Sequence, residues 1–368
     1  MSDIASTQEE REAHIADLRM RRRARARWLA TRSLLSIVVI GVLAALLLYF
    51  LFNTLRGRDV LLNQIVERLP EGDELTWSRA EGPASGPMTL YDLRYVHRAC
   101  PDRDGEPVAW PDCKTALLTV FTAKRVVLDP MLQPLLGRRL RLEAMQVSGA
   151  TLLLPESNEP FELPRWPESL PAIAPPLALE ADAIEIDDLR VLRATAPQPT
   201  SIIHLRRLRG GLVAEDGSLH LERIVADSDR GRFTAHGDYA PRDRYRMHLT
   251  ASAVLPAAAG RTPARLGLAA RGDLRKLDIA LAGNAPAPVK ARLLLEGEAQ
   301  PRWRFEANST AVTLAALLGN DDDAAPYAFD LRADGVDGHA NVQGRIAQGD
   351  ASQRGFAATV LPSKISVD

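Results

Sequence analysis

The longest apolar stretch of the chain lies near its N-terminus. Residues 33–52, SLLSIVVIGVLAALLLYFLF, form twenty consecutive positions without a charge, bounded by Arg32 and Asn53. At about 1.5 Å per residue, a helix of this length reaches roughly 30 Å, the hydrocarbon thickness of a bilayer. A cleaved signal peptide is the alternative, but its apolar region usually has about 7–15 residues, and the NTLRGR that follows offers no small-residue cleavage site. The pattern predicts a transmembrane helix.

A second, amphipathic helix follows the apolar run. Val60, Leu61 and Ile65 recur at helical spacing, and Pro70 ends the segment. We therefore assign residues 53–76 to a juxtamembrane helix and linker. The later apolar runs are only a few residues long and are flanked by charges, so the sequence predicts a single membrane crossing.

From residue 77 on, the hydrophobic period changes from 3.6 to 2. In KLDIALAG, for example, Ile279 and Leu281 alternate with charged or small residues, and similar runs continue towards the end of the chain. Turn signals such as Asp334-Gly335 recur between these runs. The pattern is typical of consecutive β-hairpins. It predicts a mainly β fold over residues 77–368, an elongated, curled antiparallel sheet with a few short helices.

The alternation gives this sheet one aliphatic face and one face of Arg, Asp, Glu and His. A long sheet with one apolar face has to hide that face by curling, by packing a second layer over it, or by keeping it for an apolar ligand. Candidate residues that line the face, taken from the clearest strands, are Ile279, Leu281, Leu293, Leu295, Phe329, Leu331, Val342 and Ile346.

Two segments interrupt the period of two. Asp129 and Pro130 supply an N-cap and a proline at the first helical position, and Gly137 supplies a stop signal, which together predict a helix of one or two turns. Between Pro155 and Pro176, seven prolines occur in 22 residues. That density predicts an extended crossing segment rather than a strand.

The charge is distributed unevenly about the apolar run. Residues 1–32 contain 8 Arg and 5 acidic residues, with six of the Arg within residues 21–32, whereas residues 53–368 have a net charge of −4. The positive-inside rule then places residues 1–32 in the cytoplasm and the bulk of the chain in the periplasm. A negatively charged body with only 5% aromatic residues excludes nucleic-acid binding by counterion release or base stacking.

The chain has two cysteines, Cys100 and Cys113. They enclose CPDRDGEPVAWPDC, a segment whose Pro, Asp and Gly content indicates a surface loop. In an oxidising compartment this loop is expected to close as a disulfide. Two free, buried thiols are the alternative, and a metal site is less favoured because the loop contains no His.

No catalytic constellation is recognisable in the sequence. The seven His are scattered, never in H-E-x-x-H or another paired spacing, and there is no G-x-S-x-G elbow, P-loop or dinucleotide-binding glycine motif. His220 and His236 could meet across strands near Asp238, but alternation places such residues on the solvated face. Residues 320–323, NDDD, lack the spaced oxygens of a calcium loop. The sequence predicts no enzyme activity, no cofactor and no metal site.

Three segments carry a resemblance to a known family. The anchor followed by residues 60–98, VLLNQIVERLPEGDELTWSRAEGPASGPMTLYDLRYVHR, resembles the start of the TamB family of AsmA-like proteins, which begin with a span, a helix and a strand pair. Residues 121–155 resemble the recurring strand, short helix and strand of that family, and residues 187–239 resemble it again. These elements are diffuse, so the resemblance rests on their order and length along the whole chain.

The resemblance implies an inner-membrane protein with a taco-shaped β-sheet and a hydrophobic groove. Family members belong to the translocation and assembly module. They are linked to phospholipid transport towards the outer membrane and to outer-membrane protein assembly and secretion with a barrel partner, TamA. Phospholipid acyl chains would then be the ligand of the groove. Because family members are much longer, this chain is expected to be the N-terminal part of such a protein, without the region that docks TamA.

Two other classes of function stay open at this point. One is an AsmA-like envelope scaffold or secretion-machinery linker, with the same anchor and β domain but a filled core and no lipid conduit. The other is a membrane-tethered periplasmic enzyme, which the lack of catalytic motifs disfavours. The lipid-transporting bridge and the scaffold differ in one structural respect. The bridge needs an apolar face that forms an open trough, whereas the scaffold has a packed core.

Overall fold

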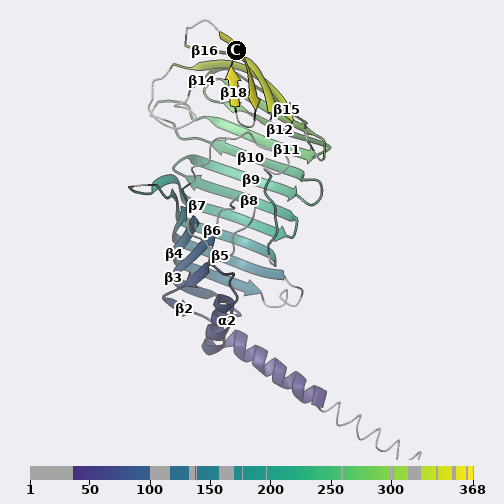
Figure 1. Ribbon diagram of the computed structural model, residues 1–368. Helices are drawn as coiled ribbons and strands as arrows, with labels where there is room; N and C mark the ends of the chain where they lie inside the picture. Colours follow the sequence, from purple (N-terminus) through teal and green to yellow (C-terminus); the bar gives the residue numbers. More distant parts are fainter. Residues whose placement is uncertain are drawn as a thin grey trace, which may run out of the picture. The chain divides into compact units, whose positions relative to one another are not determined.

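The computed structural model describes residues 36–99, 117–131, 137, 139–156, 170–175, 177–195, 197–257, 260–298, 300, 302–313, 325–336, 339–349, 354–361 and 364–367. The chain divides into two compact units, Met1–Asn63 and Gln64–Asp368. The first is helical where it is described, and the second consists almost entirely of one β-sheet (Figure 1).

The helical unit contains the apolar helix Ser36–Asn53, which overlaps the predicted span of residues 33–52 from Ser36 on and ends one residue beyond it. Its mean hydropathy is 2.4 and none of it is buried, so it is long and apolar enough to cross a membrane. A second helix, α2 (Leu55–Glu67), starts directly afterwards. It starts earlier than the hydrophobic spacing suggests because Thr54 caps it: the Thr54 hydroxyl oxygen accepts a hydrogen bond from the Gly57 N–H at 3.0 Å.

The β unit contains eighteen described strands. They are β1 (Asp73–Thr76), β2 (Arg79–Glu81), β3 (Met88–Ala99), β4 (Leu117–Met131), β5 (Arg139–Leu154), β6 (Ala178–Arg193), β7 (Thr200–Glu215), β8 (Ser218–Ser228), β9 (Gly231–Ala240), β10 (Arg246–Val254), β11 (Arg265–Asp273), β12 (Lys276–Asn284), β13 (Pro288–Glu296), β14 (Arg302–Val312), β15 (Tyr327–Val336), β16 (His339–Gln348), β17 (Arg354–Leu361) and β18 (Lys364–Val367). This content confirms the predicted mainly β fold.

The strands form one long sheet that is curled but not closed. Both β1 and β2 pair with β3, and from β3 onwards each strand pairs with the next one along the chain (Figure 1). Most of these pairs are antiparallel hairpins, as the turn signals predict. The sheet therefore grows one strand at a time, and neighbours in sequence are neighbours in space.

One pair departs from the predicted antiparallel order. Strands β5 and β6 are parallel, in a register that runs from Arg139 opposite Ala178 to Leu154 opposite Arg193. A parallel pair needs a crossover connection of about a dozen residues or more, which returns the chain to the edge where the first strand began. The proline-rich segment predicted to be an extended crossing occupies this position.

The helix predicted to start at Asp129 is wrong at its N-terminus. Strand β4 continues through Asp129 and Pro130 to Met131, with an irregularity in its pairing with β5 between the first two. A proline lacks an N–H for the ladder and is tolerated in strands at bulges of this kind. The body of the predicted helix, residues 132–136, lies outside the described residues.

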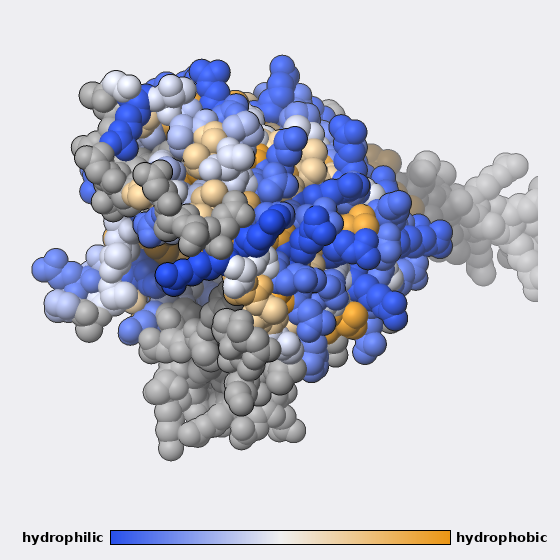
Figure 2. Space-filling view, turned by 90° about the horizontal axis from the view of Figure 1, so that it is seen from above, coloured by the Kyte–Doolittle hydropathy of each residue, from blue (hydrophilic) through white to orange (hydrophobic). Residues whose placement is uncertain are grey.

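The two faces of the sheet differ in the way the alternation predicts. Charged side chains on one face form cross-strand ion pairs, such as Arg292 with Asp278 at 2.6 Å and Arg345 with Asp330 at 3.2 Å. The hydrogen bond from Arg292 holds the pKa of Asp278 below its ordinary value. In Figure 2 hydrophilic residues dominate the view along the β unit, with small apolar areas between them. Exposed pairs of this type contribute little stability, so the fold depends mainly on the other face.

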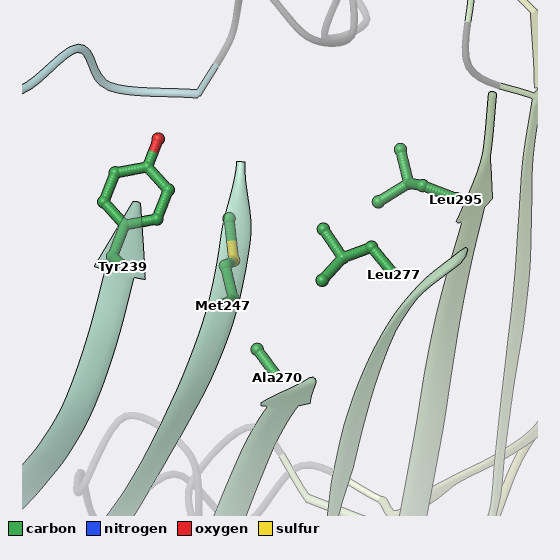
Figure 3. Close-up of a cluster of buried hydrophobic side chains, with 5 residues drawn as sticks. All are labelled: Tyr239, Met247, Ala270, Leu277 and Leu295. Carbon is green, nitrogen blue, oxygen red and sulfur yellow. The ribbon is translucent and has the colours of Figure 1, made fainter. Parts of the chain in front are cut away.

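Buried apolar clusters lie on that other face. One joins β5 and β6 through Leu142, Ala181 and Ile184. A second joins five consecutive strands, β9 to β13, whose side chains all project from the same side of the ribbon (Figure 3). Its members are Tyr239, Met247, Ala270, Leu277 and Leu295.

Candidate functional site

The strand registers place the apolar side chains of β9 to β17 in four rows that run across the sheet. The first row contains Tyr239, Met247, Gly272, Leu277, Leu295, Trp303, Gly335 and Ala340. The second contains Gly237, Leu249, Ala270, Ile279, Leu293, Phe305, Ala333, Val342 and Ala358. The third contains Ala235, Ala251, Leu268, Leu281, Ala291, Ala307, Leu331, Gly344 and Phe356. The fourth contains Phe233, Ala253, Leu266, Gly283, Val289, Ser309, Phe329, Ile346 and Arg354.

We call these four rows the apolar face. No acidic residue occurs in them, and the one cation, Arg354, lies on β17 at the end of the fourth row. With strands spaced about 4.8 Å apart, the eight steps from β9 to β17 extend over roughly 38 Å measured along the sheet. The face is therefore a continuous apolar strip rather than a set of isolated patches.

All eight predicted lining residues lie on this face, but their exposure differs. Leu295 is 0% exposed and belongs to the cluster of Figure 3, whereas Ile346 is 40% exposed. The other six are half-buried. The apolar face is thus packed at some positions, such as Leu277, Leu295 and Ala340 in the first row, and open at others, such as Ile346 in the fourth row. It is neither a fully packed core nor a fully open trough.

Small residues face large ones along the ladders. Gly335 lies opposite Trp303, and a methyl group on Gly335 would come within 2.6 Å of two ring atoms of that indole. Gly344 lies opposite Leu331 in the same way, with a leucine methyl carbon 2.6 Å from the position of an added Cβ. The large side chains lean over their glycine neighbours, which keeps the face smooth although its residues differ in size.

A segment of the β5–β6 connection is attached to the first row. We call residues 170–175 the strap. Its Leu170 and Ile173 side chains pack against the cluster of Figure 3. The Tyr239 hydroxyl donates a hydrogen bond to the Pro171 carbonyl oxygen at 2.6 Å, and the Gly217 N–H donates one to the Ile173 carbonyl oxygen at 2.7 Å. Burial raises the pKa of Tyr239 to about 12, so this hydroxyl keeps its proton at any physiological pH.

The opposite ends of these strands carry another buried cluster. Ala264, Ala285 and Val312 form its centre, and the lining candidate Phe329 packs against it. Ser309 lies beside Phe329 in the fourth row. It is only 6% exposed, and its hydroxyl oxygen has no hydrogen-bond partner among the described residues. A buried hydroxyl without a hydrogen-bond partner is uncommon and lowers the stability of the fold. Ser309 is thus a polar residue within an otherwise apolar part of the face.

Histidine side chains of several strands pair with carboxylates on the neighbouring strand. Three His–Asp pairs bridge neighbouring strands: His97 with Asp73, His204 with Asp188 and His220 with Asp238. The third is one of the contacts considered from the sequence. No group of three or more His, Cys, Asp or Glu suited to hold a metal ion occurs among the described residues. Cys100, Cys113 and residues 320–323 lie outside the described part of the chain.

Sequence reasoning found the apolar face but missed two of its features. The proline-rich segment was predicted to cross the sheet, yet nothing in its composition indicates which strands it contacts. Ser309 follows the apolar period in RWRFEANS, so its place on this face could have been inferred from the alternation with Phe305 and Ala307.

No protein-family model, no curated protein and no solved structure matches the chain. The function of the apolar face therefore has to be inferred from its own chemistry.

Proposed function

We propose that this protein is a membrane-anchored carrier that holds lipid acyl chains on the apolar face of its sheet. The observation that carries the proposal is the incomplete burial of one apolar strip without acidic residues, from Leu295 at 0% to Ile346 at 40% exposure. A core that served only to hold two layers together would be expected to be buried throughout. A half-buried apolar strip of this size is the kind of surface that proteins keep for apolar ligands.

The energetics of such a ligand are favourable without a polar clamp. Each CH₂ group removed from water contributes about 0.8 kcal/mol, so even a partly covered acyl chain of about ten methylenes gains several kcal/mol. The smooth packing of large residues against glycines lets a chain occupy different positions with similar energies. That property is better suited to a surface along which a lipid moves than to a pocket that retains a lipid.

The membrane topology is part of the proposal. The six Arg of residues 21–32 favour a cytoplasmic N-terminus, and the β unit then lies in the periplasm, anchored to the inner membrane. A reporter that is active only in the periplasm, fused after Asp368, should be active. A well-expressed but silent fusion would contradict this orientation.

The biological role follows from the resemblance to the TamB family. We propose that the protein is a bridge component in phospholipid transport towards the outer membrane and in outer-membrane protein assembly, and that it is not an enzyme. An interaction with TamA belongs to the same proposal.

A scaffold with a filled core is the second candidate function. Two observations favour it: Leu277 and Leu295 are completely buried, and the strap covers part of the first row. In that case the apolar face would serve stability alone, and no lipid would accompany the protein.

Photo-crosslinking separates the two candidates. A photoreactive residue at Leu281 or Val342, in the half-buried rows, should give lipid adducts in cells. The same residue at Ala282 or Gln343, the next positions along the same strands and on the opposite face, should give few. The charged variants Leu281→Asp and Val342→Arg should obstruct lipid occupancy while the sheet stays folded. Absence of adducts, together with a large loss of thermal stability in both charged variants, would leave the scaffold.

A further inference from the structure

We propose that the strap is a built-in occupant of the apolar face, which an acyl chain must displace to reach the first row on β9 to β13. This inference rests on the proposed function, because it concerns how lipid and strap share one surface. It makes the first row on β9 to β13 a regulated part of the strip, whereas half-buried positions of the third row, such as Leu281 and Phe356, stay accessible.

The contacts of the strap define the surface that it covers. Leu170 and Ile173 pack against the cluster that contains Leu277 and Leu295, both 0% exposed. The hydrogen bond from Tyr239 fixes the strap at the β9 end of this cluster. An acyl chain cannot occupy the positions of Leu170 and Ile173 against the cluster while the strap side chains lie there. Leu281 and Phe356 are also on the apolar face but do not belong to this cluster, and both are half-buried.

The strap side chains supply the same chemistry as a lipid tail. Leu170 and Ile173 are aliphatic and three residues apart, and the intervening Pro171 and Ala172 are exposed. The segment thus offers two aliphatic contacts, much as two stretches of methylenes would. Ligand and strap are therefore expected to compete for the same positions.

The attachment of the strap is weak enough to be reversible. Residues 170–175 form no strand and pair with none of the described strands. Two hydrogen bonds, from Tyr239 and from the Gly217 N–H, join them to β9 and to the β7–β8 turn. Each such bond contributes only about 1 kcal/mol net. Segments held by few contacts open first in native proteins, whereas the neighbouring ladders stay closed.

To test this inference, a photoreactive aromatic residue replaces either Trp303 or Phe356 in the full-length, membrane-embedded protein. Trp303 is half-buried and packs against the strap-covered cluster, and Phe356 is half-buried on β17, outside that cluster. Each probe is combined with Tyr239→Phe, which removes the hydrogen bond to the strap but keeps the ring, or with Ile173→Ser. Ala174→Ser, an exposed position on the same strap, is the matched control.

We expect lipid adducts at position 303 to increase about threefold to tenfold in Tyr239→Phe and in Ile173→Ser, and to stay unchanged in Ala174→Ser. Adducts at position 356 should be the same in all backgrounds. Adducts at 356 with no increase at 303 would overturn the strap inference alone. An absence of adducts at both positions in every background would overturn the proposed function and this inference with it. Limited proteolysis near residue 173 verifies that the two strap variants expose the segment and that the sheet remains folded.

Discussion

Adjacent leucines on β13 provide the sharpest test of the face assignment. Leu294 and Leu295 are identical in type and neighbours in sequence, but they point to opposite faces. Leu295 is 0% exposed and lies between Leu277 and Trp303 in the ladder. Leu294 is half-buried and lies on the polar face between Asp278 and Arg304. A Leu→Ala substitution removes the same side-chain atoms at either position, but from two different environments.

The expected magnitudes differ several-fold. A fully buried leucine gains about 1.5–3 kcal/mol from burial, and its truncation also leaves a cavity, so Leu→Ala changes in cores cost about 2–5 kcal/mol. We therefore expect Leu295→Ala to lower the local free energy of unfolding by about 3 kcal/mol. Leu294→Ala removes a side chain that already contacts water and charged neighbours. Its cost should stay below about 1 kcal/mol.

Hydrogen exchange followed by mass spectrometry is the suitable assay. A sheet that grows strand by strand resembles a repeat protein, in which stability is a sum of local terms, so a global melting temperature would dilute the effect. In the full-length protein, peptides from β12 to β14 should exchange faster in Leu295→Ala and nearly normally in Leu294→Ala. Equal acceleration in both variants, or a larger effect of Leu294→Ala, would refute the face assignment on which the proposed function depends.

Three further outcomes are expected. Ser309→Ala should raise stability by about 1 kcal/mol in the lipid-free protein, because it removes a buried hydroxyl without a partner, and unfolding of stripped protein checks this. Burial raises the pKa of Tyr239 to about 12, against an ordinary value near 10. The contribution of the protonated phenol to the stability of the folded protein is therefore complete below about pH 10 and is lost as the pH rises towards 12. A spectrophotometric titration that compares the protein with Tyr239→Phe should assign the late-ionising phenol to this residue. Cys100 and Cys113 should form a disulfide, worth about 2–3 kcal/mol of local order, and two alkylatable thiols in unreduced protein would contradict it.

The regular part of the sheet could be predicted because its signal is local. Alternation at positions such as Ile279, Leu293 and Phe329 depends only on the pleat of each strand, and hairpin turns fix the register between neighbours. The same reasoning identified the apolar helix, whose length and composition are sufficient on their own. In these regions the type of each residue reflects its own local environment, so the local sequence is sufficient to predict the structure.

The remaining features depend on partners far away in the chain. Whether β5 and β6 pair in parallel is not encoded in a period of two, because both orientations alternate alike. At Asp129-Pro130 the local helix signal was overridden by pairing with β5, which accommodates the proline at an irregular step. The contact of Leu170 with a cluster that begins at Tyr239, 69 residues later along the chain, depends on the path of the crossover. Packing of this kind cannot be read from either segment alone.

The single parallel step has a kinetic and thermodynamic consequence for anything that competes with the strap. Because the crossover joins β5 to β6, the strap stays tethered at both ends when it leaves the surface. The return of a tethered segment to its site is an intramolecular event, for which an effective concentration of the order of millimolar is typical. A lipid present only at trace levels in solution could not displace the strap from the first row. Lipid delivered continuously from a bilayer could displace the strap. The strap would then cover the first row again whenever the supply from the membrane stops.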